Sequence, residues 1–212
     1  MNVQVSKITK RFGGTVAIRD LSIRFPDEGT VAIMGPSGCG KTTLLQMVAG
    51  LQRPSQGSVQ CNATSSAYVF QEPRLLPWRT VADNIRLARS KKSPPSRSVE
   101  QWLEAVGLAD CAQRYPDELS GGMKQRVAIA RALYCDTELL LMDEPFRGLD
   151  EAMRDQIIDL VRRERNTPGK LTLLVTHDKK EALALADSIL LFSNAPASDF
   201  TWESVPHQST QT

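Results

Sequence analysis

No stretch of the chain approaches the roughly 20 consecutive apolar residues that a membrane-spanning helix needs. The richest apolar runs are short, for example Val31–Met34 and Leu171–Val175. The N-terminus, MNVQVSKITKRF, lacks the apolar segment and small-residue cleavage site of a secretory signal. We therefore expect a soluble, intracellular chain, and any link to a membrane must come through a partner.

Cysteine and unbalanced charge are also scarce. Cys39, Cys61, Cys111 and Cys135 are scattered, without a CxxC pair or metal-ligand spacing, which favours free thiols in a reducing cytosol. Lys and Arg total 26 against 24 Asp and Glu, a net charge of +2. This balance gives no electrostatic reason to expect nucleic acid as a partner. The 212 residues, 41% of them hydrophobic, suggest one compact domain or one domain with an inserted subdomain.

Short apolar runs typical of buried strands alternate with helical patterns. Buried strands are predicted at Val31–Met34, Leu139–Met142, Leu171–Val175 and Ile189–Phe192, and a half-buried one where Leu21, Ile23 and Phe25 alternate with polar residues. Helices are predicted at Lys41–Ala49, Gly122–Leu133, Glu151–Arg165 and Lys179–Ala186. This alternation predicts an α/β fold with a mainly parallel sheet covered on both faces.

One segment departs from this pattern. Residues 72–120 contain no convincing buried strand and predict helices at Val81–Ala88 and Val99–Val106, the second with a capping-box spacing between Ser98 and Gln101. The linker KKSPPSR (Lys91 to Arg97) separates the two helices. We interpret 72–120 as a helical subdomain inserted between core segments 1–71 and 121–195. Residues 196–212 are expected to form a polar tail, poorly ordered at its very end.

A complete P-loop pattern, GxxxxGK[ST], follows one buried strand and opens a helix. It consists of Gly35, Pro36, Ser37, Gly38, Cys39, Gly40, Lys41 and Thr42. Its glycines let the backbone curl so that successive N–H groups and the positive end of the helix face phosphate oxygens. Lys41 is expected to reach the β- and γ-phosphates, Thr42 to ligate Mg²⁺ and Thr43 to contact the α-phosphate. The motif predicts binding of a nucleoside triphosphate.

Two carboxylates, Asp143 and Glu144, end another buried strand, which a parallel sheet delivers beside the P-loop. Asp143 is placed to hold Mg²⁺, and Glu144 to polarise the attacking water as a general base. His177 follows the strand ending at Thr176, where it can contact a γ-phosphate. Asp178 fits the N-cap of the next helix.

The sequence Leu119-Ser120-Gly121-Gly122-Met123-Lys124-Gln125 resembles the signature of ATP-binding-cassette (ABC) ATPases, and the resemblance covers roughly Val3 to Phe192. The fold it implies is a P-loop NTPase core with a small antiparallel β subdomain and an inserted helical subdomain. It also implies nucleotide contacts for Ser120, Gly121, Gly122 and Gln125, and roles for other residues: Phe12 stacks on adenine, Gln71 meets Mg²⁺, Asp150 ends the D-loop and His177 is the switch histidine. The signature itself opens a helix, which makes a second anion site and hence a second nucleotide.

The family supplies the arrangement of two such sites. Two cassettes, here expected to be identical chains, face head-to-tail, and each signature covers the ATP of the other. The narrower resemblance of QEPRLLPW and of Tyr115–Leu133 is to importers of nitrate, sulfonate and taurine. It implies a membrane permease, an extracytoplasmic substrate-binding protein and a peripheral position on the cytoplasmic side of the membrane. Pro73–Arg79 would lie near the groove that receives the permease; packing of Leu75, Leu76 and Trp78 within the helical subdomain is the equal alternative.

The sequence departs from the family pattern at two places. The segment Ser58–Ala67 is short, which predicts a trimmed antiparallel subdomain, and Arg147 stands where the D-loop usually has small residues. Three other classes of function fit the sequence less well. A soluble ABC ATPase of translation or DNA maintenance usually carries two cassettes or a coiled-coil insertion. A GTPase or kinase would lack the signature, and a binding module without turnover would not need both Glu144 and His177.

Overall fold

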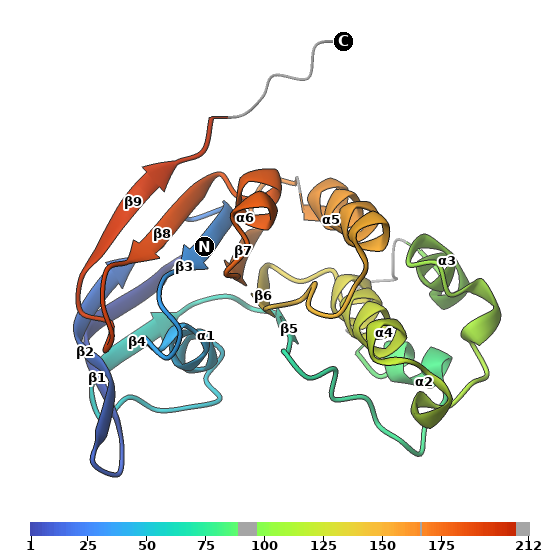
Figure 1. The fold of residues 1–212 in the computed structure, drawn as a ribbon, viewed down its shortest axis with the longest axis horizontal. Helices are drawn as coiled ribbons and strands as arrows, with labels where there is room; N and C mark the ends of the chain where they lie inside the picture. The colour runs from blue at the N-terminus through green and yellow to red at the C-terminus, as the bar shows by residue number, and fades with distance from the viewer. Residues whose placement is uncertain (89–96, 166, 207–212) are drawn as a thin grey trace.

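A six-stranded sheet with the strand order β5-β6-β7-β3-β8-β9 forms the centre of the molecule (Figure 1). In the computed structural model of the protein, residues 1–88, 97–165 and 167–206 are described. The strands are β5 (Ser66–Val69), β6 (Leu139–Asp143), β7 (Leu171–Val175), β3 (Gly29–Met34), β8 (Ser188–Phe192) and β9 (Phe200–Ser204). The first five are parallel and β9 is antiparallel to β8. The predicted, mainly parallel sheet is therefore confirmed.

A separate three-stranded antiparallel sheet has the order β2-β1-β4. It consists of β1 (Val3–Phe12), β2 (Thr15–Arg24) and β4 (Gln56–Cys61). This sheet is the expected small antiparallel subdomain. The alternating residues Leu21 and Ile23 lie in β2 and are buried, while the polar residues between and beside them are exposed.

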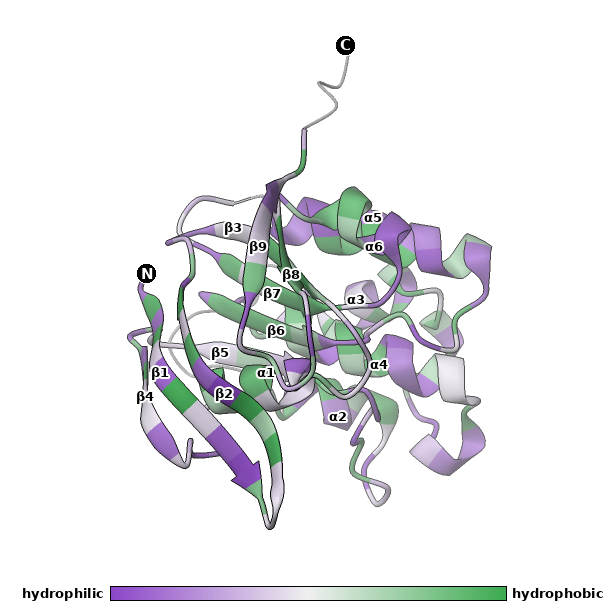
Figure 2. Cartoon of the chain, turned by 60° about the vertical axis from the view of Figure 1, so that its left-hand side comes forward, coloured by the Kyte–Doolittle hydropathy of each residue, from purple (hydrophilic) through white to green (hydrophobic). Residues whose placement is uncertain are grey.

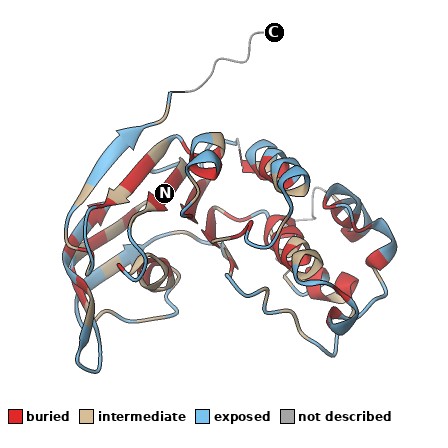
Figure 3. Cartoon of the chain, in the orientation of Figure 1, coloured by how far each residue is buried: buried red, intermediate tan, exposed pale blue. Residues whose placement is uncertain are grey.

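Helices cover both faces at the middle of the central sheet, which explains why β6 and β7 are buried along their whole length (Figure 2). In β6, Leu139 and Leu141 face α1 (Lys41–Val48), whereas Leu140 and Met142 face α4 (Gly121–Tyr134) and α5 (Glu151–Arg165). The last helix, α6 (Lys179–Leu185), packs on Ala32 of β3 and Ile189 of β8. All five residues of β6 and of β7 are buried (Figure 3).

The segment 72–120 is helical, as predicted. It contains α2 (Val81–Arg86), α3 (Val99–Ala105) and two short 3-10 turns, η1 (Ala109–Cys111) and η2 (Pro116–Glu118). The capping box of Ser98 and Gln101 is present at the start of α3. The linker, except for Arg97, lies outside the described residues. Both helices pack against α4, which the sequence analysis assigns to the core, and no helix among the described residues is long and apolar enough to cross a membrane.

The expected polar tail contains a strand that the sequence analysis does not predict. In β9, Phe200 pairs with Phe192 and Ser204 with Ser188 of β8. The loop before β9 returns to the P-loop, since the Ala197 N–H donates to the Cys39 carbonyl at 3.0 Å. The sequence does carry a strand signal here, since Phe200 and Trp202 alternate with polar residues, and their rings lie edge-on to Phe192 and Phe25. The extreme end that was expected to be poorly ordered, 207–212, lies outside the described residues.

Candidate active site

The P-loop joins the end of β3 to the start of α1 with a backbone that only glycine adopts readily. Gly35, Gly38 and Gly40 have φ values of 144°, 74° and 103°. A Cβ atom on Gly40 would lie 2.7 Å from the Ala17 carbonyl oxygen, so β2 packs directly against the loop. Gly40 is also the N-cap of α1, where it has no side chain to occupy the first N–H groups. The helix start is thus open to an anionic ligand.

Replacing Gly40 by alanine is expected to weaken nucleotide binding at least tenfold and to lower the melting temperature. The added Cβ must displace the Ala17 carbonyl, and the positive φ adds about 1–3 kcal/mol of backbone strain. Differential scanning fluorimetry with and without ATP measures both effects. Gly14→Ala is the matched control, since nothing lies within 4 Å of its added Cβ. Equal melting temperatures and equal ATP affinities of the Gly40 and Gly14 variants would contradict the close approach of the Ala17 carbonyl to Gly40.

Lys41, at the start of α1, points into the cavity and is held by the loop itself. Its Nζ donates to the Gly35 carbonyl at 2.9 Å and to the Pro36 carbonyl at 2.8 Å. The Cys39 side chain is fully buried 3.8 Å from the same Nζ, so Cys39 faces the interior rather than the cavity. The ammonium is therefore positioned by backbone oxygens at the mouth of the phosphate cradle.

Asp143 ends β6 directly behind the P-loop. The Thr42 hydroxyl donates to its Oδ1 at 3.1 Å, and the Tyr68 hydroxyl, from β5, donates to its Oδ2 at 3.5 Å. Burial raises the pKa of the Asp143 carboxyl, and the hydrogen bond from Thr42 lowers it. Burial, followed by the charge of Asp143, also raises the pKa of Tyr68. A buried carboxylate next to a hydroxyl is a donor pair suited to a hard cation such as Mg²⁺.

Glu144 stands in the left-handed region with φ 45°, a conformation that is uncommon for a residue with a side chain. Its N–H donates to the Val175 carbonyl at 2.9 Å, which fixes the backbone on β7. Oε2 accepts from Gln71 Nε2 at 3.5 Å and lies 4.0 Å from Arg147 Nη1; Oε1 lies 3.4 Å from His177 Nδ1. The twist at Glu144 thus turns its carboxylate away from the strand and into a ring of polar groups.

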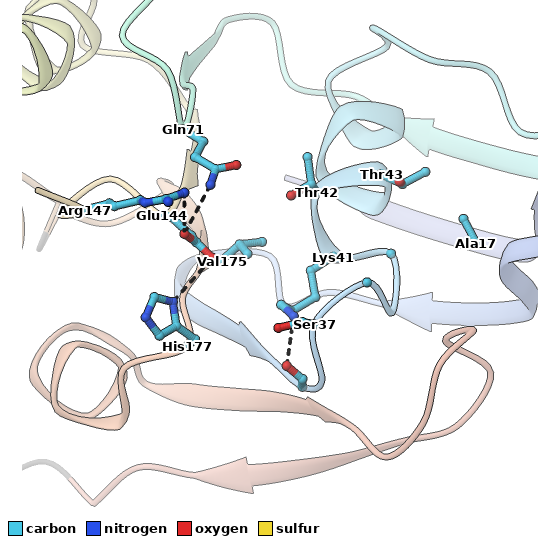
Figure 4. A pocket seen from close by; sticks show the side chains of 13 residues that line it. Ala17, Ser37, Lys41, Thr42, Thr43, Gln71, Glu144, Arg147, Val175 and His177 are labelled. Atoms are coloured by element: carbon cyan, nitrogen blue, oxygen red, sulfur yellow. Dashed lines mark hydrogen bonds and ion pairs between the residues drawn. The ribbon is translucent and has the colours of Figure 1, made fainter. Parts of the chain in front are cut away.

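The P-loop residues around Lys41 and the residues around Glu144 line one cavity of about 630 Å³. Figure 4 shows Glu144 and its partners on one side and Lys41 with the start of α1 on the other. The lining comprises Ala17, Gly35, Ser37, Gly38, Gly40, Lys41, Thr42, Thr43, Gln71, Glu144, Arg147, Val175 and His177. Ala17, Arg147 and Val175 were not among the predicted binding residues. The cavity joins residues from distant parts of the sequence, which hides Ala17 and Val175 from sequence reasoning. Of the three, only Arg147 could have been noticed in the sequence, because it departs from the family pattern.

Phe12 and Gln125 lie elsewhere. Phe12 ends β1, is 48% exposed and has the Lys10 ammonium 4.9 Å from its ring centroid; it is not part of the cavity lining. Gln125 is 2% exposed and donates to the Phe70 carbonyl at 3.4 Å. The structure therefore gives Gln125 a packing position that supports the chain leading to Gln71. Burial inside α4 is a tertiary effect that the signature pattern does not reveal.

The signature residues open α4 away from the cavity. The Ser120 hydroxyl caps the helix by accepting from the Met123 N–H at 3.3 Å. Gly122 lies against the D-loop, because a Cβ there would be 3.1 Å from the Gly148 carbonyl oxygen. Asp150 in turn caps α5 by accepting from the Met153 N–H at 3.0 Å. Ser120, the two signature glycines and Asp150 do not line the P-loop cavity of their own chain.

The Asp178 carboxylate accepts from the Lys180 N–H at 2.7 Å, so the predicted N-cap of α6 is confirmed. Behind it, the buried Thr176 hydroxyl donates to Glu181 at 2.5 Å, and burial raises the pKa of the Glu181 carboxyl. These bonds fix the turn that carries His177 from the end of β7 to the start of α6. His177 itself stays exposed and faces Glu144.

Comparisons with known proteins agree with this geometry. Residues 18–147 match the family described as ABC transporter. The aliphatic sulfonates import ATP-binding protein SsuB 2 of Pseudomonas fluorescens is 44% identical over 197 residues, which cover 90% of this chain and 73% of that protein. The sulfate/thiosulfate import ATP-binding protein CysA of Ralstonia nicotianae is 39% identical over 211 residues, covering 91% of this chain and 57% of that protein.

A solved structure resembles the chain over nearly its whole length. It is the dimeric post-hydrolysis state of an ATP-binding cassette bound to ADP and Pi, with a TM-score of 0.84, 27% identity and coverage of 97% of this chain and 99% of that one. The chain therefore belongs to the ABC transporter family, as one of its ATP-hydrolysing cassettes.

Proposed function

We propose that the chain is the ATP-hydrolysing subunit of an importer and drives a membrane permease through a dimer of two identical cassettes. One observation carries the proposal: Lys41 and Glu144 face the same cavity, whereas the signature at Ser120 opens outside it. A complete site then needs the signature of a second chain. The ADP- and Pi-bound cassette that this chain resembles is a dimer, which supports a head-to-tail pair.

In this mechanism the chain's own residues bind and orient the substrate. The P-loop N–H groups and Lys41 bind the phosphates of ATP, and Thr43 faces them from α1. Glu144 accepts a proton as water attacks the terminal phosphorus and the bond to the ADP oxygen breaks. Gln71 and His177, both within 3.5 Å of the Glu144 carboxylate, orient it and sense the terminal phosphate.

The donor set fits Mg²⁺. The Thr42 hydroxyl oxygen lies 3.1 Å from Asp143 Oδ1, and Gln71 lines the same cavity as Thr42. No cluster of three or more His, Cys, Asp or Glu side chains stands within the described ranges, which suits a cation that takes its remaining ligands from phosphates and water. When bound, Mg²⁺ supplies positive charge that neutralises phosphate oxygens. Thr42, Asp143 and Gln71 are the residues that would hold it.

The segment Pro73–Arg79 is the surface proposed to receive the permease. Trp78 is 69% exposed, while Leu75 packs partly against the core. Asn84 fixes the turn between them, since it accepts from the Leu76 N–H at 2.7 Å and donates to the Leu76 and Arg79 carbonyls. A rigid turn that presents an exposed indole is suited to a protein partner. On this basis we propose a peripheral position for the cassette on the cytoplasmic side of the membrane.

The transported substrate is proposed to be a small oxyanion-bearing solute such as a sulfonate, taurine or nitrate, delivered by an extracytoplasmic binding protein. Support comes from the relatives named as aliphatic sulfonates and sulfate/thiosulfate import proteins. The P-loop residues that line the cavity are suited to the phosphates of ATP, and we assign selection of the cargo to the permease and the binding protein.

Purification of the tagged chain from its native membranes in mild detergent tests the proposal. We expect a permease and a solute-binding protein to be recovered with it. Trp78→Ala should reduce recovery of the permease about tenfold, whereas Leu183→Ala, which truncates another exposed side chain, should not. Recovery of ribosomal or DNA-bound proteins without a permease would contradict the importer and favour a soluble ATPase.

A further inference from the structure

Arg147 is a cationic side chain that the proposed mechanism does not use. It lies in the turn after Glu144, lines the same cavity as Lys41, and its Nη1 is 4.0 Å from Glu144 Oε2. Figure 4 shows the guanidinium beside the Glu144 carboxylate. We propose that Arg147 binds the terminal phosphate of ATP in its own chain, and that this contact releases Glu144 for catalysis. The inference rests on the proposed ATPase function.

The backbone of Arg147 is held by a hydrogen bond, while most of its side chain is exposed. Its N–H donates to the Glu144 carbonyl at 3.3 Å, and the Leu149 N–H donates to the Phe146 carbonyl at 3.2 Å. Phe146 is buried and anchors the turn in the core. The Arg147 side chain, by contrast, is 64% exposed. A held backbone and an exposed guanidinium leave room for the side chain to change partner when a ligand arrives.

The pair with Glu144 is weak enough to exchange. At 4.0 Å the two groups form an ion pair that is too long for a hydrogen bond, and a long pair with an exposed arginine contributes little. A phosphate offers more charge and a geometry that the planar guanidinium matches with two parallel hydrogen bonds. Glu144 keeps partners after the exchange, because Gln71 and His177 also lie within 3.5 Å of its oxygens. Arg147 can therefore move to ATP while the Glu144 carboxylate keeps Gln71 and His177 as polar partners.

The charges that line the cavity also favour binding of a phosphate by Arg147. Among the lining side chains, Lys41 and Arg147 carry positive charge at neutral pH and Glu144 carries negative charge. Without Arg147 these charges cancel, and with it the lining is net positive toward a triphosphate. The P-loop binds the inner phosphates, whereas Arg147 stands beside Glu144, which must face the water at the terminal phosphate. Arg147 should therefore distinguish ATP from ADP.

The test is equilibrium binding of ADP and of the non-hydrolysable analogue adenylyl imidodiphosphate, measured by calorimetry at concentrations where light scattering shows a monomer. Arg147→Ala should raise the Kd of the triphosphate analogue about tenfold and that of ADP less than twofold. Arg147→Lys should recover part of the lost affinity for the triphosphate analogue, because lysine keeps the positive charge but lacks the planar guanidinium that forms two parallel hydrogen bonds. Arg162→Ala is the matched control, since the Arg162 side chain is 59% exposed and also forms an ion pair, with Asp159 on α5.

Equal changes for both nucleotides, or none for either, would overturn the assignment of Arg147 to the terminal phosphate. An effect that appears only when the chain dimerises would overturn its placement in the same chain. Failure of the unaltered chain to bind either nucleotide would instead overturn the proposed ATPase function. The two failures are thus distinguishable.

Discussion

Replacement of Glu144 by glutamine is expected to lower ATP turnover by about 10²–10⁴-fold while ATP binding survives. The amide is nearly the same size as the carboxylate but cannot accept the proton of the attacking water. It also removes a negative charge from a cavity that receives a triphosphate, so affinity for ATP should hold or rise. Phosphate release and nucleotide binding, measured on the same preparation, separate the two effects.

The same variant should accumulate a stable ATP-bound dimer, visible by size-exclusion chromatography with ATP and absent with ADP. ATP shifts the equilibrium between open and closed cassettes only through contacts made in one state, and blocked turnover leaves that state populated. Glu203→Gln, an exposed acid on β9, is the control and should keep normal turnover. Loss of ATP binding in the Glu144 variant would contradict the assignment of Glu144 as the general base.

Replacement of Lys41 by alanine is the second large effect we expect, a fall of ~10²–10³-fold in hydrolysis with weaker nucleotide binding. Lys41 is held by two P-loop carbonyls, at 2.8 and 2.9 Å, so its ammonium is already positioned before a phosphate enters. Alanine removes this positioned charge. Steady-state kinetics and the Kd of ATP are the measurements.

Arginine at position 41 should not rescue the loss, because its planar fork cannot replace a compact ammonium between two carbonyls. Lys180→Ala, which removes a side chain that is 85% exposed, serves as the control for lost charge. The melting temperature of the Lys41 variant should stay close to that of the unaltered chain. Turnover within threefold of the unaltered chain would contradict a role for Lys41 at the phosphates.

Features set by local chemistry were predictable from the sequence. The bounds of β7 and α5 agree with the expectation, and the caps at Ser98 and Asp178 are present. The P-loop, Asp143, Glu144 and His177 were assigned from strand ends, and the structure brings them to one cavity, apart from the buried Asp143 behind it. These predictions succeed because a buried parallel strand ends at a fixed edge of the sheet.

Features set by tertiary contacts were not predictable. β9 is a short strand completed by its pairing with β8, and the alternation of Phe200 and Trp202 with polar residues is too brief to stand out in a mostly polar segment. Gln125 is held inside α4 by the Phe70 carbonyl, whereas its place in the signature suggested a nucleotide contact. Arg147 stood out only as a departure from the family pattern, and its ion pair with Glu144 depends on a turn anchored by Phe146.

The position of β3 at the middle of the central sheet has a consequence for synthesis of the chain. Its two neighbours, β7 and β8, and Ala197, which braces the P-loop at Cys39, all come from the last part of the described sequence. A nascent chain on the ribosome therefore carries the whole phosphate-binding motif before either strand that flanks β3 has been made. Of the contacts described above, only the packing of β2 at Gly40 is available to the loop at that stage, and the site is complete only after β8 and Ala197 have been synthesised.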